Sequence, residues 1–137
     1  MPTFEGLDAD AARAFAERWL PAWTGGDADR LLAFYAPDAL YSDPGVPEGV
    51  RGDALRTYFT RLLGHNPAWV WHHTGSDPLP GGFVNRWRAT IPVGPRRFGV
   101  TGICLVFLNE DGLIEKNEVF FDRSGLHKAM ADVRHDG

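Results

Sequence analysis

The chain has 137 residues, of which 44% are hydrophobic and 12% aromatic, and this composition is typical of one globular domain with a sizeable core. The formal net charge is −4 and no run of Lys or Arg could follow a phosphate backbone, so nucleic-acid binding is not expected. The one cysteine excludes an internal disulfide and a two-cysteine metal site. Neither a signal peptide nor an apolar span is visible, which predicts a cytoplasmic protein that does not enter a membrane.

The beginning of the chain predicts a helix. Apolar residues recur close to helical spacing over residues 8–24, and either Asp8 or Asp10 can cap the start of this helix. Pro21 lies inside the pattern and should kink the helix or shift its last turn, before a pair of glycines ends it.

Two more helices and one strand follow. Asp27 should cap a short helix over residues 28–35, and a strand over residues 39–43 should come next. A third helix is expected over residues 53–63, with its first residue as N-cap and Gly64 as its stop.

The second half of the chain predicts strands. Four of them are expected, over residues 69–75, 83–93, 97–108 and 113–122. An Asp-Gly pair within residues 109–112 is a strong hairpin signal between the last two. Asp122 or Ser124 can cap a last short helix. Helices followed by strands predict an α+β domain, in which a curved antiparallel sheet wraps around the N-terminal helices.

The segment over residues 35–47 carries the most informative residues, because it reads as a helix stop, a short strand and an Asp-Pro-Gly turn. Tyr41 and Asp43 are two positions apart, so on a strand their side chains share one face. A phenol and a carboxylate on one face are typical of site chemistry, and an apolar cavity around them would resist ionisation of the acid. The alternative is that Asp43 only ends the strand with good turn chemistry.

The order of these elements, with several of their segments, resembles the SnoaL-like polyketide cyclases of the nuclear-transport-factor-2-like superfamily. The matching segments are Trp23-Thr24-Gly25-Gly26-Asp27, Phe34-Tyr35-Ala36-Pro37-Asp38-Ala39, Tyr41-Ser42-Asp43-Pro44-Gly45, Val50-Arg51-Gly52, residues 107–115 and residues 120–126. The resemblance spans nearly the whole chain and implies a cone-shaped α+β barrel, as one domain over residues 1–137. The same fold hosts isomerases, cyclases, dehydratases, hydrolases and ligand binders, so the resemblance does not select a reaction.

The resemblance also implies roles for individual residues. Asp43 stands where ketosteroid isomerases keep the general base that moves a proton beside a carbonyl. Trp19 and Cys104 stand where those enzymes use a tyrosine and a protonated aspartate as oxyanion donors. Asp122 matches the acid that cyclases and epoxide hydrolases use near the end of the last strand, and Arg88 is the candidate cation beside it.

These residues also have interpretations without a functional role. Asp122 can be a helix N-cap, and Arg88 a solvated strand residue. Tyr41 can be half-buried core, and Cys104 a small buried hydrophobe. No metal site is expected, because the one adjacent pair of histidines points to opposite faces of a strand. No cofactor is expected either, since a nucleophile elbow and a glycine-rich phosphate loop are missing from the sequence.

Together with these residues, the resemblance implies a SnoaL-like, cofactor-independent enzyme that acts on a hydrophobic, carbonyl-bearing or polycyclic small molecule. Asp43 and Asp122 would move a proton in a cyclisation or an isomerisation, like a polyketide cyclase or a ketosteroid isomerase. The residues expected to contact the substrate are Trp19, Tyr41, Phe59, Arg88, Cys104 and Phe120. Two alternatives stay open: a non-catalytic member that binds a small apolar ligand, and a structural module whose sheet only dimerises.

Alternation along the last strand bears on assembly. If its face with Phe120 and Asp122 looks into the cavity, Phe121 lies on the outer face of the sheet. The other apolar residues of that outer face would be Val119, Ile103, Leu105 and Phe107. Soluble monomers seldom expose a large apolar patch, and a two-fold pair is the commonest assembly, so a homodimer is expected.

Overall fold

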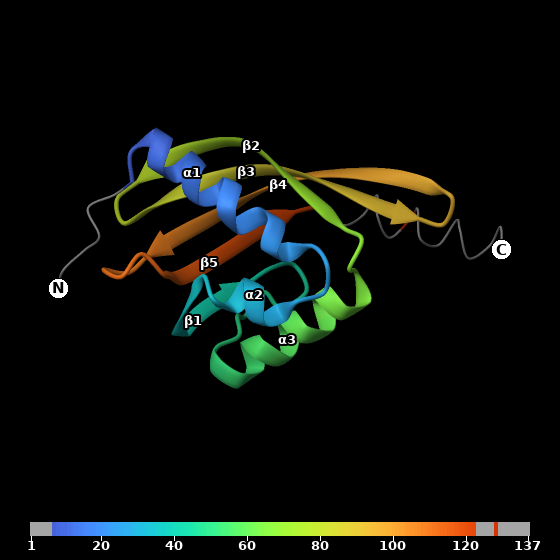
Figure 1. Cartoon of the computed structure of the whole chain (residues 1–137), viewed down its shortest axis with the longest axis horizontal. Coiled ribbons are helices and arrows are strands. Elements are labelled where there is room, and N and C mark those ends of the chain that lie inside the picture. The colour runs from blue at the N-terminus through green and yellow to red at the C-terminus, as the bar shows by residue number, and fades with distance from the viewer. Residues whose placement is uncertain (1–6, 123–127, 129–137) are drawn as a thin grey trace.

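The computed structural model describes residues 7–122 and Lys128 (Figure 1). Its helical elements are α1 (Ala9–Trp19), the 3-10 helix η1 (Leu20–Trp23), α2 (Ala28–Leu32) and α3 (Gly52–His65). Its strands are β1 (Tyr35–Ser42), β2 (Val70–Leu79), β3 (Gly82–Val93), β4 (Arg96–Leu108) and β5 (Ile114–Phe121). The expected α+β class is confirmed, whereas the helix expected after residue 122 lies outside the described residues.

The first two helices begin at the predicted caps. The side chains of Asp8 and Asp27 each accept a hydrogen bond from a backbone amide of the first turn, at 2.7 Å and 3.1 Å. Pro21 shifts the end of the first helix as expected, because α1 stops before it and the proline lies within η1.

The predicted end of the second helix is wrong. α2 stops at Leu32, and Tyr35 already belongs to β1. A proline restricts the residue before it to extended backbone, so Pro37 disfavours helical backbone at the residue that precedes it. The strand therefore starts earlier than the sequence pattern suggested.

Both predicted boundaries of the third helix are also wrong. The extended residue that precedes α3 is Arg51, so Asp53 lies in the first turn and is not the cap. Gly64 keeps a helical backbone with a negative φ, and α3 continues through it to His65. A glycine near a helix end costs some helix propensity but does not by itself terminate the helix.

The sheet has five strands in the order β1-β5-β4-β3-β2. Neighbouring strands from β2 to β5 are antiparallel, and the predicted hairpin is confirmed where the Gly112 amide donates to the Asn109 carbonyl at 3.0 Å. β1 differs from the expected antiparallel sheet, because it joins the edge of β5 in parallel. Side chains alternate in the same way on parallel and antiparallel strands, so periodicity does not reveal the direction of an edge strand.

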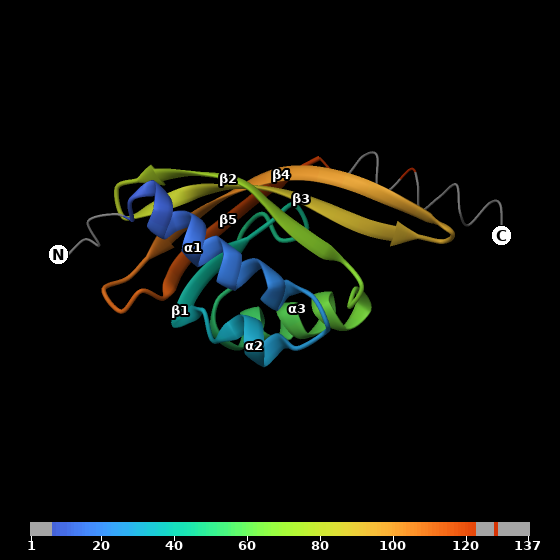
Figure 2. The ribbon, with the colours of Figure 1, turned by 45° about the horizontal axis from the view of Figure 1, so that its top comes forward.

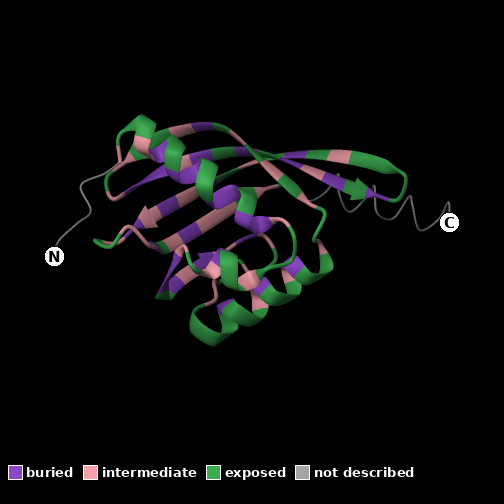
Figure 3. Ribbon diagram, in the orientation of Figure 1, coloured by how far each residue is buried: buried purple, intermediate pink, exposed green. Residues whose placement is uncertain are grey.

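The helices all lie on one side of the curved sheet. α1 crosses the strands, while α2 and α3 lie near β1 and leave part of the long β3–β4 hairpin uncovered (Figures 1 and 2). Buried and exposed residues alternate along α1 (Figure 3), and the buried ones are Ala12, Phe15, Ala16 and Trp19. Within residues 7–122, no helix has the length and apolar character that crossing a membrane requires.

The inward face of β5 is the opposite of the one expected. Asn117 is fully buried, and Val119 and Phe121 pack against the core, whereas Phe120 is 48% exposed. Alternation along a strand fixes which residues share a face but not which of the two faces is buried. The prediction that Asp122 faces the cavity was therefore wrong, because the alternation of β5 is shifted by one residue from the expected one.

Candidate functional site

A cavity lies between the sheet and the helices, and its walls are mainly aromatic. All five tryptophans of the chain line it, together with Tyr41, Asp43, Cys104 and otherwise apolar side chains. Of the residues expected to contact a substrate, Trp19, Tyr41 and Cys104 are thus brought to one cavity. The sequence did not indicate that the other four tryptophans, which come from η1, β2, β3 and the residue before β2, would meet there.

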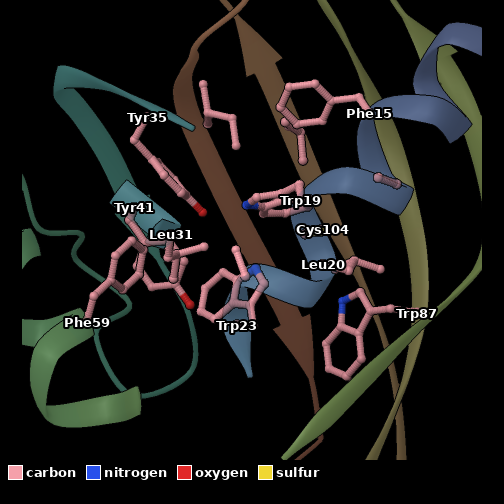
Figure 4. Packing of buried hydrophobic residues seen from close by; sticks show 14 of the residues in the cluster. Phe15, Trp19, Leu20, Trp23, Leu31, Tyr35, Tyr41, Phe59, Trp87 and Cys104 are labelled. Atoms are coloured by element: carbon pink, nitrogen blue, oxygen red, sulfur yellow. The ribbon is translucent and has the colours of Figure 1, made fainter. Parts of the chain in front are cut away.

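The indole rings form a connected wall. Trp23 lies at its centre, with ring centroids 6.0 Å from Trp19 and 5.8 Å from Trp71. Trp69 extends the wall by a further contact of 6.0 Å with Trp71. Trp87 projects from the sheet beside Leu20 and close to Trp23 in the close-up view (Figure 4).

Asp43 directly follows β1 and is 9% exposed. Its Oδ1 accepts hydrogen bonds from the amides of Gly45 at 2.7 Å and Val46 at 3.2 Å. These contacts close the Asp-Pro-Gly turn, so the interpretation of Asp43 as a turn residue is confirmed. The turn also fixes the carboxylate at the cavity wall.

Two phenols hold the other side of this carboxylate. Tyr41 donates to Oδ2 at 2.8 Å, which confirms that Tyr41 and Asp43 share a face. Tyr58 of α3 donates to the same oxygen at 2.7 Å, and its oxygen is 2.9 Å from Oδ1. Sequence reasoning treated Tyr58 only as an apolar helix residue, and its helical spacing from Leu55 and Leu62 was the only available sign that it faces the interior.

The hydrogen-bonding capacity of Asp43 is filled. A carboxylate offers about four lone-pair sites, and two amides with two phenols occupy them. Burial, and secondly the negative charge of Asp43, raise the pKa of Tyr41 well above 10.0. Tyr41 therefore keeps its proton at neutral pH and remains a donor.

Other polar groups are buried beside the cavity. The Trp19 indole nitrogen points toward the Tyr35 hydroxyl (Figure 4) but makes no hydrogen bond within the described residues. Tyr35 instead accepts a hydrogen bond of 2.8 Å from the Asn117 side chain. Burial raises the pKa of Cys104 to about 12, so its thiol is neutral at pH 7 and is not an activated nucleophile.

The remaining candidate residues do not line the cavity. Phe59 is fully buried behind Tyr41, with their ring centroids 4.9 Å apart. Arg88 is exposed, because its neighbour on β3 points inward and alternation sends Arg88 to the outer face. Phe120 lies on that outer face too, and Asp122 is exposed after the end of β5. The structure therefore brings Asp43 to the cavity without Asp122.

Among the described residues, no three His, Cys, Asp or Glu side chains are grouped as a metal site would require.

The fold has close counterparts among solved structures. A SnoaL-like protein of unknown function from Burkholderia thailandensis E264 superposes with a TM-score of 0.70 at 18% identity, covering 81% of this chain and 93% of that one. A candidate isomerase of the SnoaL-like family from Agrobacterium tumefaciens C58 gives 0.65 at 22% identity, covering 81% and 97%. AclR, a candidate hydroxylase from Streptomyces galilaeus, gives 0.73 at 12% identity, covering 91% and 98%.

At these identities the structural similarity establishes the fold alone, and no curated protein sequence gave a significant match. The sequence profile of the SnoaL-like domain, however, matches residues 16–117, from α1 to the buried asparagine of β5. That span includes all the residues that line the cavity except Val119 and Phe121. The chain therefore belongs to the SnoaL-like family.

Proposed function

We propose that this protein is a cofactor-independent enzyme that isomerises or cyclises a hydrophobic, carbonyl-bearing small molecule. Asp43 is the general base in this proposal. The observation that carries it is the position of this residue: Asp43 is the one carboxylate among the cavity-lining residues of the described chain. The apolar walls would hold the substrate and exclude water from the reacting atoms.

The reaction begins with a proton on the carbon beside the carbonyl. Asp43 takes this proton, the electron pair moves into an enolate, and the proton returns at another carbon in an isomerisation. One lone pair of Oδ2 has to become free first. Tyr58 is the donor suited to turn away, because it is half-buried, whereas Tyr41 is fully enclosed.

A β,γ-unsaturated ketone such as 3-cyclohexenone tests this proposal without knowledge of the natural substrate. Proton transfer converts it to the conjugated ketone, whose ultraviolet absorbance reports the rate. We expect turnover above the buffer rate that saturates with ketone concentration. A rate that only equals the buffer rate, for this ketone and for larger cyclic homologues, would contradict the enzymatic proposal.

A non-catalytic ligand-binding protein is the second candidate. The filled hydrogen-bonding capacity of Asp43 favours it, since a carboxylate that already accepts four hydrogen bonds has no lone pair ready for a substrate. Saturable quenching of tryptophan fluorescence by the ketone, without any turnover, would support this candidate.

We further propose a homodimer formed through the outer face of the sheet. Ile103 and Phe120 are 40% and 48% exposed and lie opposite each other across β4 and β5. The reversed phase of β5 thus brings Phe120 instead of Phe121 to the outer face, where it forms an apolar patch with Ile103 beside the charged side chains of Arg86 and Arg88. A second copy of the same surface would cover it.

Light scattering at micromolar concentration tests the dimer. We expect a mass of twice 15.2 kDa for the unmodified chain and a shift toward 15.2 kDa for Phe120→Lys, because a lysine would be desolvated in the interface. Thr60→Lys, at an exposed position of α3, is the matched control and should leave the mass unchanged. A monomeric mass for the unmodified protein would refute the proposal.

A further inference from the structure

We propose that the cavity binds an organic cation, and specifically a quaternary ammonium group carried by a small apolar molecule. The proposal goes beyond catalysis, because it concerns what the cavity holds and not whether the bound molecule reacts. It rests on the charge, the hydrogen bonds and the aromatic walls of the cavity, which are independent observations.

The first observation is a buried carboxylate that has no counter-charge among the described residues lining the cavity. Asp43 is 9% exposed, and the residues that line the cavity in the described chain include no Lys, Arg or His. The ion pairs of the described residues lie elsewhere, at Arg56–Asp29, Arg86–Asp77 and Lys116–Glu118. Buried charges in proteins are normally paired, so a ligand is the natural source of the missing positive charge.

The second observation concerns the kind of cation. Both oxygens of Asp43 already accept hydrogen bonds, from Gly45 and Val46 on one side and from Tyr41 and Tyr58 on the other. A primary ammonium or a guanidinium would have to displace one of these donors to make its own hydrogen bond. A quaternary ammonium has no N–H, so it can lie near the carboxylate and leave all four donors in place.

The third observation is the aromatic wall. Trp is the best aromatic partner for a cation, and contact within about 6 Å of a ring centroid is attractive. All five tryptophans of the chain line the cavity, and four of them are connected through Trp23 and Trp71. The other ionisable groups at the cavity, Tyr41 and Cys104, are neutral at pH 7 because burial raises both pKa values. Among the described residues, Asp43 thus supplies the single fixed charge at the cavity.

An isosteric pair of ligands tests the proposal on the unmodified protein. Choline and 3,3-dimethyl-1-butanol have nearly the same shape, but only choline carries a charge. Both can be titrated at equilibrium against the fluorescence of the tryptophans. We expect choline to bind at least about tenfold more tightly. The binding free energy from a desolvated cation–π contact and a buried carboxylate together exceeds the free-energy difference that corresponds to a tenfold ratio of dissociation constants. Equal binding, tighter binding of the alcohol, or no saturable quenching by choline would overturn the proposal.

A variant tests whether the carboxylate of Asp43 causes the preference for choline over the alcohol. Asp43→Asn keeps an oxygen for the two turn amides but removes the charge, so the ratio of the two dissociation constants should fall toward one. Asp38→Asn, an exposed position of β1, is the matched control and should keep the ratio of the unmodified protein. A preference for choline that survived Asp43→Asn undiminished would overturn the assignment to this carboxylate. The readout is binding alone, so a protein that fails to turn over ketones can still pass this test, and one that isomerises ketones can still fail it.

Discussion

Asp43→Asn is expected to lower the turnover of a β,γ-unsaturated ketone by about 10²–10⁴-fold, the usual contribution of a general base. The amide has nearly the shape of the carboxylate but cannot take up a proton. Its oxygen can still accept from the Gly45 and Val46 amides, so the turn after β1 should persist. Saturation kinetics of the ketone, together with circular dichroism of the variant, measure the effect on rate and on fold.

Two other substitutions give this experiment its controls. Asp38→Asn makes the same chemical change at an exposed site and should leave the rate unchanged. Asp122→Asn shows whether one or two carboxylic acids take part in the proton transfer. Because Asp122 is exposed and is not among the lining residues, we expect it to matter much less than Asp43. A rate that survived Asp43→Asn would remove this residue from the mechanism and leave the ligand-binding candidate.

The part of the site that is local in sequence could be predicted. Tyr41 and Asp43 share a face because strand alternation over two residues is a property of the backbone itself. Tyr58 could not be found in this way, because its contact with Asp43 depends on where α3 lies against β1. The same limit applies to the tryptophan wall, whose rings meet only after the sheet has curved around η1.

Strand phase accounts for the site residues of the sheet that were misplaced. On β5, periodicity showed which residues alternate, but an assumption about Asp122 decided which set faced inward, while on β3 only the resemblance suggested that Arg88 is near the substrate. That assumption sent Phe120 into the cavity and Phe121 out of it, whereas the structure has the reverse. Burial is decided by the packing partners of a strand, which a single sequence does not contain.

The fold was predicted better at helix starts than at helix ends. The caps of α1 and α2 are side-chain hydrogen bonds made within one turn, so Asp27 could be identified directly and Asp8 as one of two candidates. The helix ends and the direction of β1 depend on competition with neighbouring elements. The observed helix ends therefore differ from the predicted ones, and β1 runs parallel to its neighbour instead of antiparallel. Neither difference changes the α+β class.

Phe59 gives the sharpest test of how the aromatic residues divide between core and cavity. The sequence placed Phe59 among the residues that contact the substrate, but it is fully buried. Its ring centroid lies 4.9 Å from that of Tyr41 and 5.2 Å from those of Tyr35 and Trp23. Phe59→Ala should therefore reduce the free energy of unfolding by about 3–5 kcal/mol, the typical cost of a phenylalanine-sized hole in a core.

Urea unfolding at one fixed protein concentration measures this loss, which is a large share of the roughly 5–15 kcal/mol that stabilises a typical domain. Phe59→Leu fills most of the hole and should cost less than about 1.5 kcal/mol, so it reports on the site even if the alanine variant barely folds. Thr60→Ala, the exposed neighbour on α3, should change stability by no more than about 0.5 kcal/mol. A loss below about 1 kcal/mol for Phe59→Ala would mean that water or ligand already reaches this ring, because a truncated side chain costs little where no close-packed contacts are lost. Phe59 would then belong to the cavity wall, as the sequence suggested, and the support that it gives to Tyr41 and through it to Asp43 would have to come from Trp23 and Tyr58 instead.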